Sequence, residues 1–332
     1  MQHALAHAFA VEPQRQVTPM AAVTTRIPWE ANRLWPRLKA QRQHGLATEA
    51  LQSIETNADY IESGGVRFVV RILATLSRKE KARKQQERTA SANPFLPYEE
   101  DLYVTDISKT HLCLLNKFNV VDYHFLIVTR QFEPQENWLS LADFEALIRC
   151  LTEVEGLAFF NGGTVAGSSQ PHKHLQVVPY AKAAKDFSIE RVIPAVENSG
   201  EVVRASRLPF RHAITKCLPW ERDASEAVST QPAETYIKEK AQQYLSHYHN
   251  LLSAVGITSS THWQGKQTAA YNLLCTRQWM MIVPRSQEKY AAISVNSLGF
   301  AGSLLVKDTE SMAQLKSIGP MTLLQKVSFP NP

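Results

Sequence analysis

Residues 140–178 constrain the fold of this chain most, because they combine a helical pattern, two strand patterns and a glycine-rich turn. From Leu141 onward, apolar residues recur at spacings of three and four, which predicts a helix with one apolar stripe. Ser140 and Asp143 resemble a capping box in which Asp replaces the usual Glu. Gly156 is well placed to end the helix. The apolar stripe must then pack against another element.

Two predicted strands follow this helix, separated by a loop of small residues. The first has the sequence LAFF (157–160) and runs into the turn signal Asn161-Gly162-Gly163. The loop AGSSQP leads into the second strand, predicted at His172–Val178. We therefore predict an α+β fold in which an antiparallel sheet carries the histidine strand and helices flank it.

The rest of the chain adds strands and helices around this unit. The further predicted elements are a helix after Pro28, strands at Val66–Leu73, His111–Asn116 and Tyr123–Thr129, a helix at about 233–255, a hairpin from YNLLCT and WMMIVP, and strands in AAISV and SLLVK. Two prolines make NPFLPYEEDL irregular. A soft boundary near 180–205 divides the chain into an N-terminal catalytic domain (1–190) and a C-terminal domain (205–332) with an α/β extension.

Composition excludes several classes of protein. Charged residues make up 20% and no run approaches a bilayer span, so we expect neither membrane insertion nor a signal peptide. The net charge of +5 comes largely from residues 78–88, with six Lys or Arg and two Glu. This run contains no aromatic residue, which argues against nucleic-acid binding and fits a solvated segment or a cover over a phosphate site. Four widely spaced cysteines fit a reducing cytoplasm.

The strand PHKHLQVV places His172, His174 and Gln176 on one face, because side chains alternate along a strand. Three interpretations of the two imidazoles remain open at this point. They bind a metal, although no nearby Cys or carboxylate completes a ligand set; one of them attacks phosphorus, with the small-residue loop holding phosphate oxygens; or they are ordinary structural histidines.

The segment GSSQPHKHLQ resembles the histidine-triad superfamily, in the transferase branch whose third histidine is replaced by glutamine. More closely, the chain is similar to the ATP adenylyltransferase (diadenosine tetraphosphate phosphorylase) family. The similar blocks, in order, are NPFLPYEEDLYV, LLNKFNVVDYHFLIVTRQFEPQ, LAFFNGGTVAGSSQPHKHLQVVP, YNLLCTRQWMMIVPRS and ISVNSLGFAGSLLVK. The resemblance implies a histidine-triad-like sheet and spans roughly residues 66–310.

The resemblance also implies roles for individual residues. His174 matches the nucleophile, Gln176 the residue that bonds the transferred phosphoryl group, and His172 a residue that orients or polarises the site. The residues implied to bind nucleotide or phosphate are Asn161, Gly167, Ser168, Ser169, Gln170, Asn116, Lys117 and Lys79. Lys81 or Lys84 are alternatives to Lys79. Tyr271, Arg277 and Arg285 are either further nucleotide contacts or parts of an ordinary hairpin.

The implied reaction is a reversible double displacement in which phosphate cleaves diadenosine tetraphosphate to ADP and ATP. Mg²⁺ is expected to accompany the polyphosphate, with no organic cofactor, and the partners are the nucleotides and phosphate. The alternatives are a hexose-1-phosphate uridylyltransferase, which shares the H-x-H-x-Q strand, and a non-catalytic nucleotide-binding module. The oligomeric state, the base preference and the direction of flux are not determined by these patterns.

Overall fold

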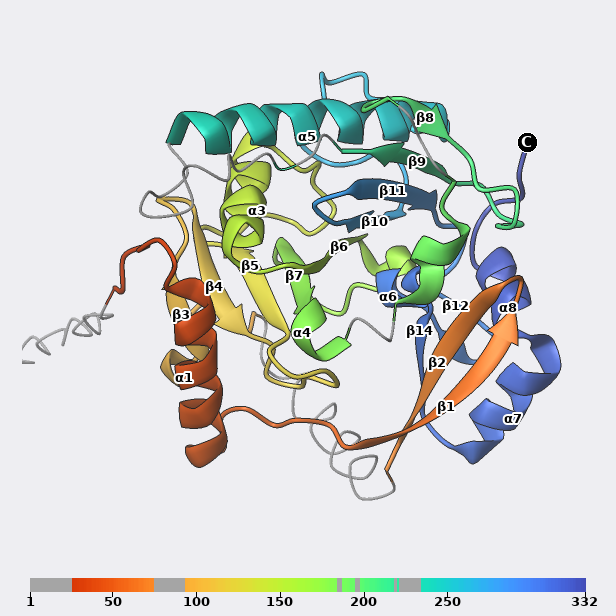
Figure 1. Ribbon diagram of the computed structural model, residues 1–332, viewed down its shortest axis with the longest axis horizontal. Helices are drawn as coiled ribbons and strands as arrows, with labels where there is room; N and C mark the ends of the chain where they lie inside the picture. Colours follow the sequence, from red (N-terminus) through yellow and green to blue (C-terminus); the bar gives the residue numbers. More distant parts are fainter. Residues whose placement is uncertain (1–25, 75–92, 184–186, 195–197, 218–219, 221–233) are drawn as a thin grey trace, which may run out of the picture.

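A nine-stranded antiparallel sheet forms the centre of the molecule (Figure 1). The computed structural model describes residues 26–74, 93–183, 187–194, 198–217, 220 and 234–332. In spatial order the strands are β3 (Tyr103–Asp106), β4 (His111–Leu115), β5 (Phe125–Thr129), β7 (His174–Pro179), β6 (Gly156–Gly162), β10 (Tyr271–Cys275), β11 (Trp279–Pro284), β9 (Ala213–Lys216) and β8 (Val202–Val203).

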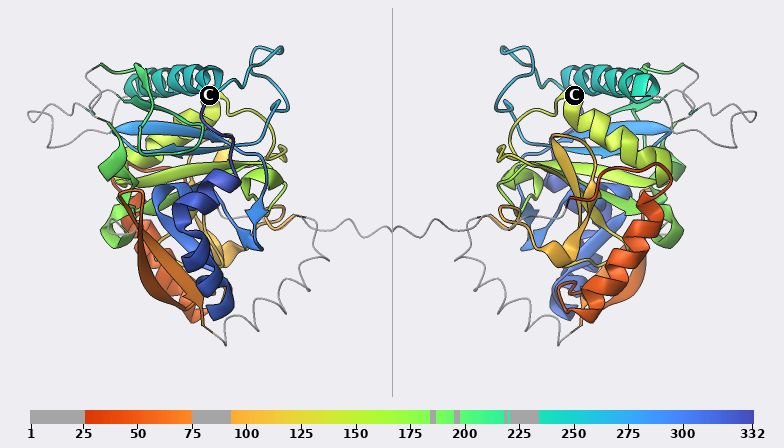
Figure 2. Two further views of the ribbon diagram at one scale, coloured as in Figure 1. Left: turned by 90° about the vertical axis from the view of Figure 1, so that its right-hand side faces the viewer. Right: turned by 90° about the vertical axis from the view of Figure 1, so that its left-hand side faces the viewer.

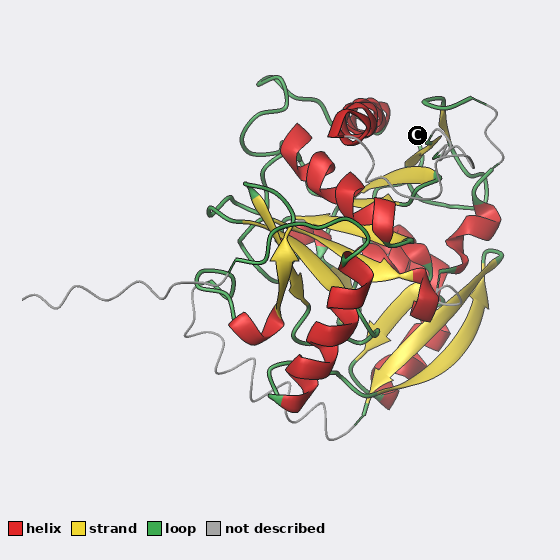
Figure 3. Ribbon diagram, turned by 60° about the vertical axis from the view of Figure 1, so that its left-hand side comes forward, coloured by secondary structure: helices red, strands yellow, loops and turns green. Residues whose placement is uncertain are grey.

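Three helices cover one face of this sheet, as Figure 3 shows from a second direction. They are α1 (Leu34–Ala47), α3 (Leu141–Glu153) and α5 (Glu234–Ala254). Their apolar residues form one core with the side chains that the strands direct toward them, including Leu175 and Val177 of β7. Alternation along β7 therefore leaves His174 and Gln176 on the opposite face.

A second layer packs on that opposite face (Figure 2). Its sheet has the order β1 (Thr56–Ser63), β2 (Val66–Leu73) and β14 (Ser303–Val306), with β14 parallel to β2. The C-terminal helices in this layer are α6 (Ser297–Ala301), α7 (Thr309–Ile318) and α8 (Pro320–Lys326), and the remaining short elements are α4 (Tyr180–Ala183), β12 (Lys289–Tyr290) and β13 (Ile293–Ser294). A second core fills the space between the layers.

The predicted α+β fold with an antiparallel sheet flanked by helices is confirmed. The capping box of α3 is present, because Ser140 Oγ accepts from the Asp143 N–H while the Asp143 carboxylate accepts from the Ser140 N–H. The strands β4 and β5 pair along their length and are buried on both faces, as their apolar runs predict.

Two local predictions are wrong. Gly156 does not end α3, which stops at Glu153; it begins β6, where a Cβ atom would lie 2.5 Å from the Val178 carbonyl oxygen. This glycine therefore serves close strand packing. The segment AAISV is not a strand throughout, because Ala291 and Ala292 have φ values of +50° and +62° and form the turn between β12 and β13.

The division into residues 1–190 and 205–332 stays a prediction. The two larger sheets each combine strands from the two segments: β14 pairs with β2, and β10 pairs with β6. The segments thus share their cores. Among the described helices, none has both the length and the apolar composition that a bilayer span requires.

Candidate active site

A cavity of about 590 Å³ lies between the two layers. Residues of β4, β5, β6 and β7 line one side of it, and residues of β2 and β14 line the other. The predicted site residues that line the cavity are His174, Gln176, Asn161, Asn116, Lys117, Gly167, Ser169 and Gln170. Residues separated by up to 60 positions in sequence therefore meet at one place because of the sheet order.

His174 is held by its Nδ1 atom, which donates to the His172 carbonyl oxygen at 2.8 Å. Since a carbonyl oxygen only accepts, Nδ1 carries the ring proton and Nε2 keeps its lone pair for a substrate. Burial lowers the pKa of His174 from 6.5 to about 4. Phe95 packs edge-on against the ring, with 5.4 Å between centroids. The imidazole is therefore neutral at pH 7, with a defined tautomer.

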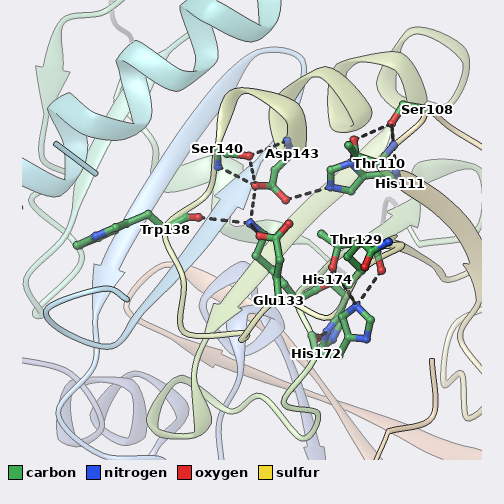
Figure 4. Close-up of polar contacts among 12 residues, drawn as sticks. Ser108, Thr110, His111, Thr129, Glu133, Trp138, Ser140, Asp143, His172 and His174 are labelled. Atoms are coloured by element: carbon green, nitrogen blue, oxygen red, sulfur yellow. Dashed lines mark hydrogen bonds and ion pairs between the residues drawn. The ribbon is translucent and has the colours of Figure 1, made fainter. Parts of the chain in front are cut away.

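His172 contacts the protein with both ring nitrogens and does not line the described cavity. Its Nε2 donates to the Thr129 carbonyl oxygen at 2.8 Å (Figure 4). Its Nδ1 accepts from Asn93 Nδ2 at 3.1 Å. The interpretation that its imidazole polarises a substrate is not supported by this geometry. His172 instead acts on His174 through its main chain, because its carbonyl oxygen accepts from His174 Nδ1 and so orients the His174 ring.

Gln176 lies on the cavity wall beside a histidine that the sequence patterns did not single out. His124, just before β5, is buried next to Gln176, and its Nδ1 accepts from Asn116 Nδ2 at 3.0 Å. Burial lowers the pKa of His124 to about 4, so this ring is also neutral at pH 7. An isolated histidine at the start of a buried apolar strand was the only sequence signal for it.

Asn161 is held from the C-terminal half of the chain. Its Oδ1 accepts from Asn272 Nδ2 at 2.9 Å and from the N–H and Oγ of Ser297 at 2.9 and 2.7 Å. Arg285 in turn donates to Asn272 Oδ1 at 2.6 Å. With Oδ1 committed in this way, the Asn161 amide nitrogen is the group available to a nucleotide.

Arg285 is engaged by protein groups that lie behind the site. Its buried guanidinium also donates to the carbonyl oxygens of Val327 and Val295, at 3.0 and 2.8 Å. Burial lowers its pKa to about 10. Tyr271 Oη bonds Tyr248 Oη within the helix-side core. Arg277 donates to the Leu151 carbonyl oxygen at 2.7 Å. For these three residues the structure favours the ordinary hairpin.

The loop before β7 is organised by its own hydrogen bonds. The N–H groups of Ala166, Gly167 and Ser168 donate to carbonyls within the loop, and Ser168 Oγ donates to the Gln170 carbonyl oxygen. These three N–H groups are thus engaged within the loop, and phosphate binding by the loop stays a prediction. Gly167 is required, because its φ is +87° and a Cβ atom would lie 2.7 Å from the Val295 carbonyl oxygen. Ser169 is among the loop residues that face the cavity.

Three cations line the described cavity. Lys117, as predicted, is one of them, and it forms an ion pair with Glu99. Arg71 of β2 and Lys307 after β14 are the others, and neither was predicted. They come from the second layer, so only the packing of the two sheets brings them to the histidine strand. Lys79, Lys81 and Lys84 lie outside the described residues.

Comparisons with known proteins give a consistent assignment. A family model for the Ap4A phosphorylase N-terminal domain matches residues 24–195, and one for the ATP adenylyltransferase C-terminal domain matches residues 206–330. Diadenosine 5',5'''-P1,P4-tetraphosphate phosphorylase 2 of Saccharomyces cerevisiae is 28% identical over 290 residues, which cover 80% of this chain and 84% of the yeast protein.

The fold is also found in solved structures. The crystal structure of yeast Ap4A phosphorylase Apa2 has a TM-score of 0.69 and 24% identity, covering 92% of this chain and 97% of that one. A structure of Apa2 in complex with Ap4A has a TM-score of 0.65 and 23% identity, with 90% of this chain and 98% of that one covered. The first family model alone spans more than half of the sequence. The chain therefore belongs to the Ap4A phosphorylase family.

Proposed function

We propose that this protein catalyses the reversible phosphorolysis of diadenosine tetraphosphate to ADP and ATP, with His174 as the nucleophile. The observation that carries the proposal is the state of the His174 ring, which is neutral, held through Nδ1, and placed on the wall of the cavity. Family membership supplies the substrate class, because the matching yeast relative is a diadenosine tetraphosphate phosphorylase. The cavity is therefore the proposed site of the nucleotidyltransferase reaction.

The proposed reaction has two displacements. The Nε2 lone pair of His174 attacks the α-phosphorus of one adenylyl group, and ATP leaves as the bond to its terminal phosphate oxygen breaks. Phosphate then attacks the same phosphorus, which releases ADP and returns the electron pair to Nε2. While the adenylyl group is attached, the ring carries positive charge, and the hydrogen bond from Nδ1 to the His172 carbonyl stabilises that charge.

Gln176 favours phosphate over water as the acceptor. A carboxamide does not exchange protons near neutral pH, so it is a poor general base for an attacking water. An anionic phosphate needs no such base. Lys117, Arg71 and Lys307 place positive charge around the cavity where a phosphate and a polyphosphate chain would lie.

A product assay tests the proposed function. Incubation with diadenosine tetraphosphate and phosphate is expected to yield ADP and ATP in equal amounts, with little turnover when phosphate is omitted. The products are separated by ion-exchange chromatography. AMP and ATP as the main products, formed equally well without phosphate, would mean that the enzyme is a hydrolase and would contradict the proposal.

The pH dependence of kcat/KM is a second test. Because burial lowers the pKa of His174 to about 4, the neutral nucleophile is present throughout the range above that value and is lost only below it. The acid limb of kcat/KM is therefore expected to inflect near pH 4, measured at constant ionic strength. An inflection near 6.5, the ordinary histidine value, would show that the ring is solvated and would contradict the described geometry.

Two further parts of the proposal concern the setting of the enzyme. Mg²⁺ would enter with the polyphosphate as part of the substrate; among the described residues, no group of three or more His, Cys, Asp or Glu side chains is placed to hold a resident ion. A cytoplasmic location is supported by the four cysteines, all buried free thiols, since secreted proteins tend to oxidise theirs.

A further inference from the structure

Gln135 occupies an unusual place between two strands of the central sheet. It lies in the connection between β5 and α3, and its side chain is 2% exposed. Its Oε1 accepts from the His174 N–H at 2.8 Å, and its Nε2 donates to the Asn161 carbonyl oxygen at 2.9 Å. One carboxamide therefore contacts the main chain of both the nucleophile and the nucleotide-binding asparagine.

The register of the sheet shows what this carboxamide replaces. β6 and β7 pair from Gly156↔Pro179 to Phe159↔Gln176. Hydrogen-bonded and non-hydrogen-bonded pairs alternate along such a ladder, so a pair of the same kind as Phe159↔Gln176 would next place Asn161 opposite His174. In a continued ladder the His174 N–H would donate to the Asn161 carbonyl. The two groups instead bond to opposite ends of the Gln135 amide. The side chain is inserted into the ladder at the point where the pairing stops.

The neighbouring backbone holds Gln135 in this position. Its N–H donates to the Pro171 carbonyl oxygen at 2.7 Å, and the Lys173 N–H donates to the Glu133 carbonyl oxygen at 2.7 Å. Residues 133–135 thus run beside 171–173 in the manner of a short strand, with a bridge between Pro134 and His172. On its other edge, β6 stays paired with β10 as far as Gly162, so the ladder stops only on the side that faces β7. The two strands diverge around the inserted amide.

We propose that Gln135 is a positioning residue for adenylyl transfer, whose inserted carboxamide sets the spacing and orientation of His174 relative to Asn161. The orientation of the amide is unambiguous, because an N–H must meet its oxygen and a carbonyl must meet its nitrogen. Without the insertion the two strands would close, and His174 and Asn161 would lose the separation with which both line the cavity. The inference rests on the proposed function only in assigning His174 the role of nucleophile.

Two variants and a matched control test the proposal. Gln135→Met removes, at similar volume, these two hydrogen bonds and a third, longer one from Nε2 to the His174 carbonyl oxygen at 3.3 Å. Gln135→Glu keeps an acceptor for the His174 N–H, but when ionised has no donor for the Asn161 carbonyl. Thr276→Val is the control, because Thr276 is 2% exposed and its Oγ1 accepts from the N–H groups of Gln278 and Trp279 at the far end of β10 from Asn272.

The first measurement is the single-turnover rate of protein labelling from diadenosine tetraphosphate carrying a labelled α-phosphate, at saturating substrate and normalised to folded protein. Both Gln135 variants are expected to label about 100-fold more slowly than the wild type, since a displacement near 1 Å of a reacting group has an effect of that size. Thr276→Val is expected to label at the wild-type rate even if its melting temperature falls as far.

The second measurement does not depend on catalysis. Nitrogen NMR of ¹⁵N-histidine-labelled protein, with the His174 signal assigned from His174→Gln, is expected to show a single Nδ1–H tautomer in the wild type and a mixture in both Gln135 variants. If the variants label as fast as Thr276→Val, or if their His174 tautomer is unchanged, the proposal is wrong. If the wild type takes no label, the proposed function fails, and the NMR result alone decides the role of Gln135.

Discussion

Replacing His174 by glycine is expected to lower phosphate-dependent cleavage of diadenosine tetraphosphate by at least about a thousandfold, because it removes the only atom to which the adenylyl group would be transferred. The effect should appear in kcat and not as a change in KM alone. The measurement is the initial rate of ADP formation, together with labelling of the protein by α-phosphate-labelled substrate. The variant is expected to take no label.

The folding of the His174→Gly variant must be checked, because the ring packs against Phe95 and its main chain bonds Gln135. A circular dichroism spectrum and a melting curve close to those of the wild type establish that the loss is chemical. His44→Gly is a suitable labelling control, since His44 lies half-exposed at the end of α1, away from the cavity. A His174→Gly protein that turned over at the wild-type rate would rule out the covalent mechanism.

The second large effect is on stability and concerns Asp143. Its carboxylate is 1% exposed and bonds three residues: Lys173 through Nζ at 2.8 Å, and His111 through its ring at 3.1 Å and Ser140 through its N–H and hydroxyl at 2.7 Å (Figure 4). Asp143→Ala is expected to lower the free energy of unfolding by about 3–5 kcal/mol, since it leaves a buried lysine without its closest buried counter-charge. Denaturant titration measures this change.

The network also lies directly behind β7, the strand that begins at His174. Lys173 points away from the cavity while His174, the next residue, points into it, so the ion pair with Asp143 fixes the strand from its other face. Burial alone would raise the pKa of Asp143, but His111 and Lys173 more than offset it and hold that pKa well below its usual range. The stabilisation is therefore present above about pH 4, the unfolded value, and is lost as the pH falls toward the folded pKa.

Glu234→Ala is the matched control for Asp143→Ala. Glu234 is also an acid in the first turn of a helix with a basic partner, Arg149, but its side chain is 61% exposed. The expected loss there is within about 1 kcal/mol. A combined Asp143→Leu and Lys173→Met variant is expected to recover much of the lost stability, because two apolar side chains need no counter-charge. Equal losses for Asp143→Ala and Glu234→Ala would contradict the role assigned to this network.

Local patterns in the sequence determined the kinds of elements and the direction of the key side chains. The spacing of apolar residues after Ser140 and the Ser140–Asp143 pair were sufficient for α3, because a helix and its cap depend on neighbours within one turn. The alternation of His174 and Gln176 along one strand likewise follows from backbone geometry alone. The H-x-H-x-Q strand and its loop thus predicted five of the residues that line one wall of the cavity, namely Gly167, Ser169, Gln170, His174 and Gln176.

The tertiary structure alone decided which residues from elsewhere complete the site. Arg71 and Lys307 reach the cavity because β14 pairs in parallel with β2 across more than 200 residues, and a pairing at that distance leaves no local signal. The sequence patterns did not single out Gln135, which is inserted beside His174. They gave Arg285 only as a possible nucleotide contact, whereas it supports Asn161 through Asn272. Their roles depend on which buried polar groups still need a hydrogen-bond partner once the sheets have packed. Only the folded molecule determines which groups these are.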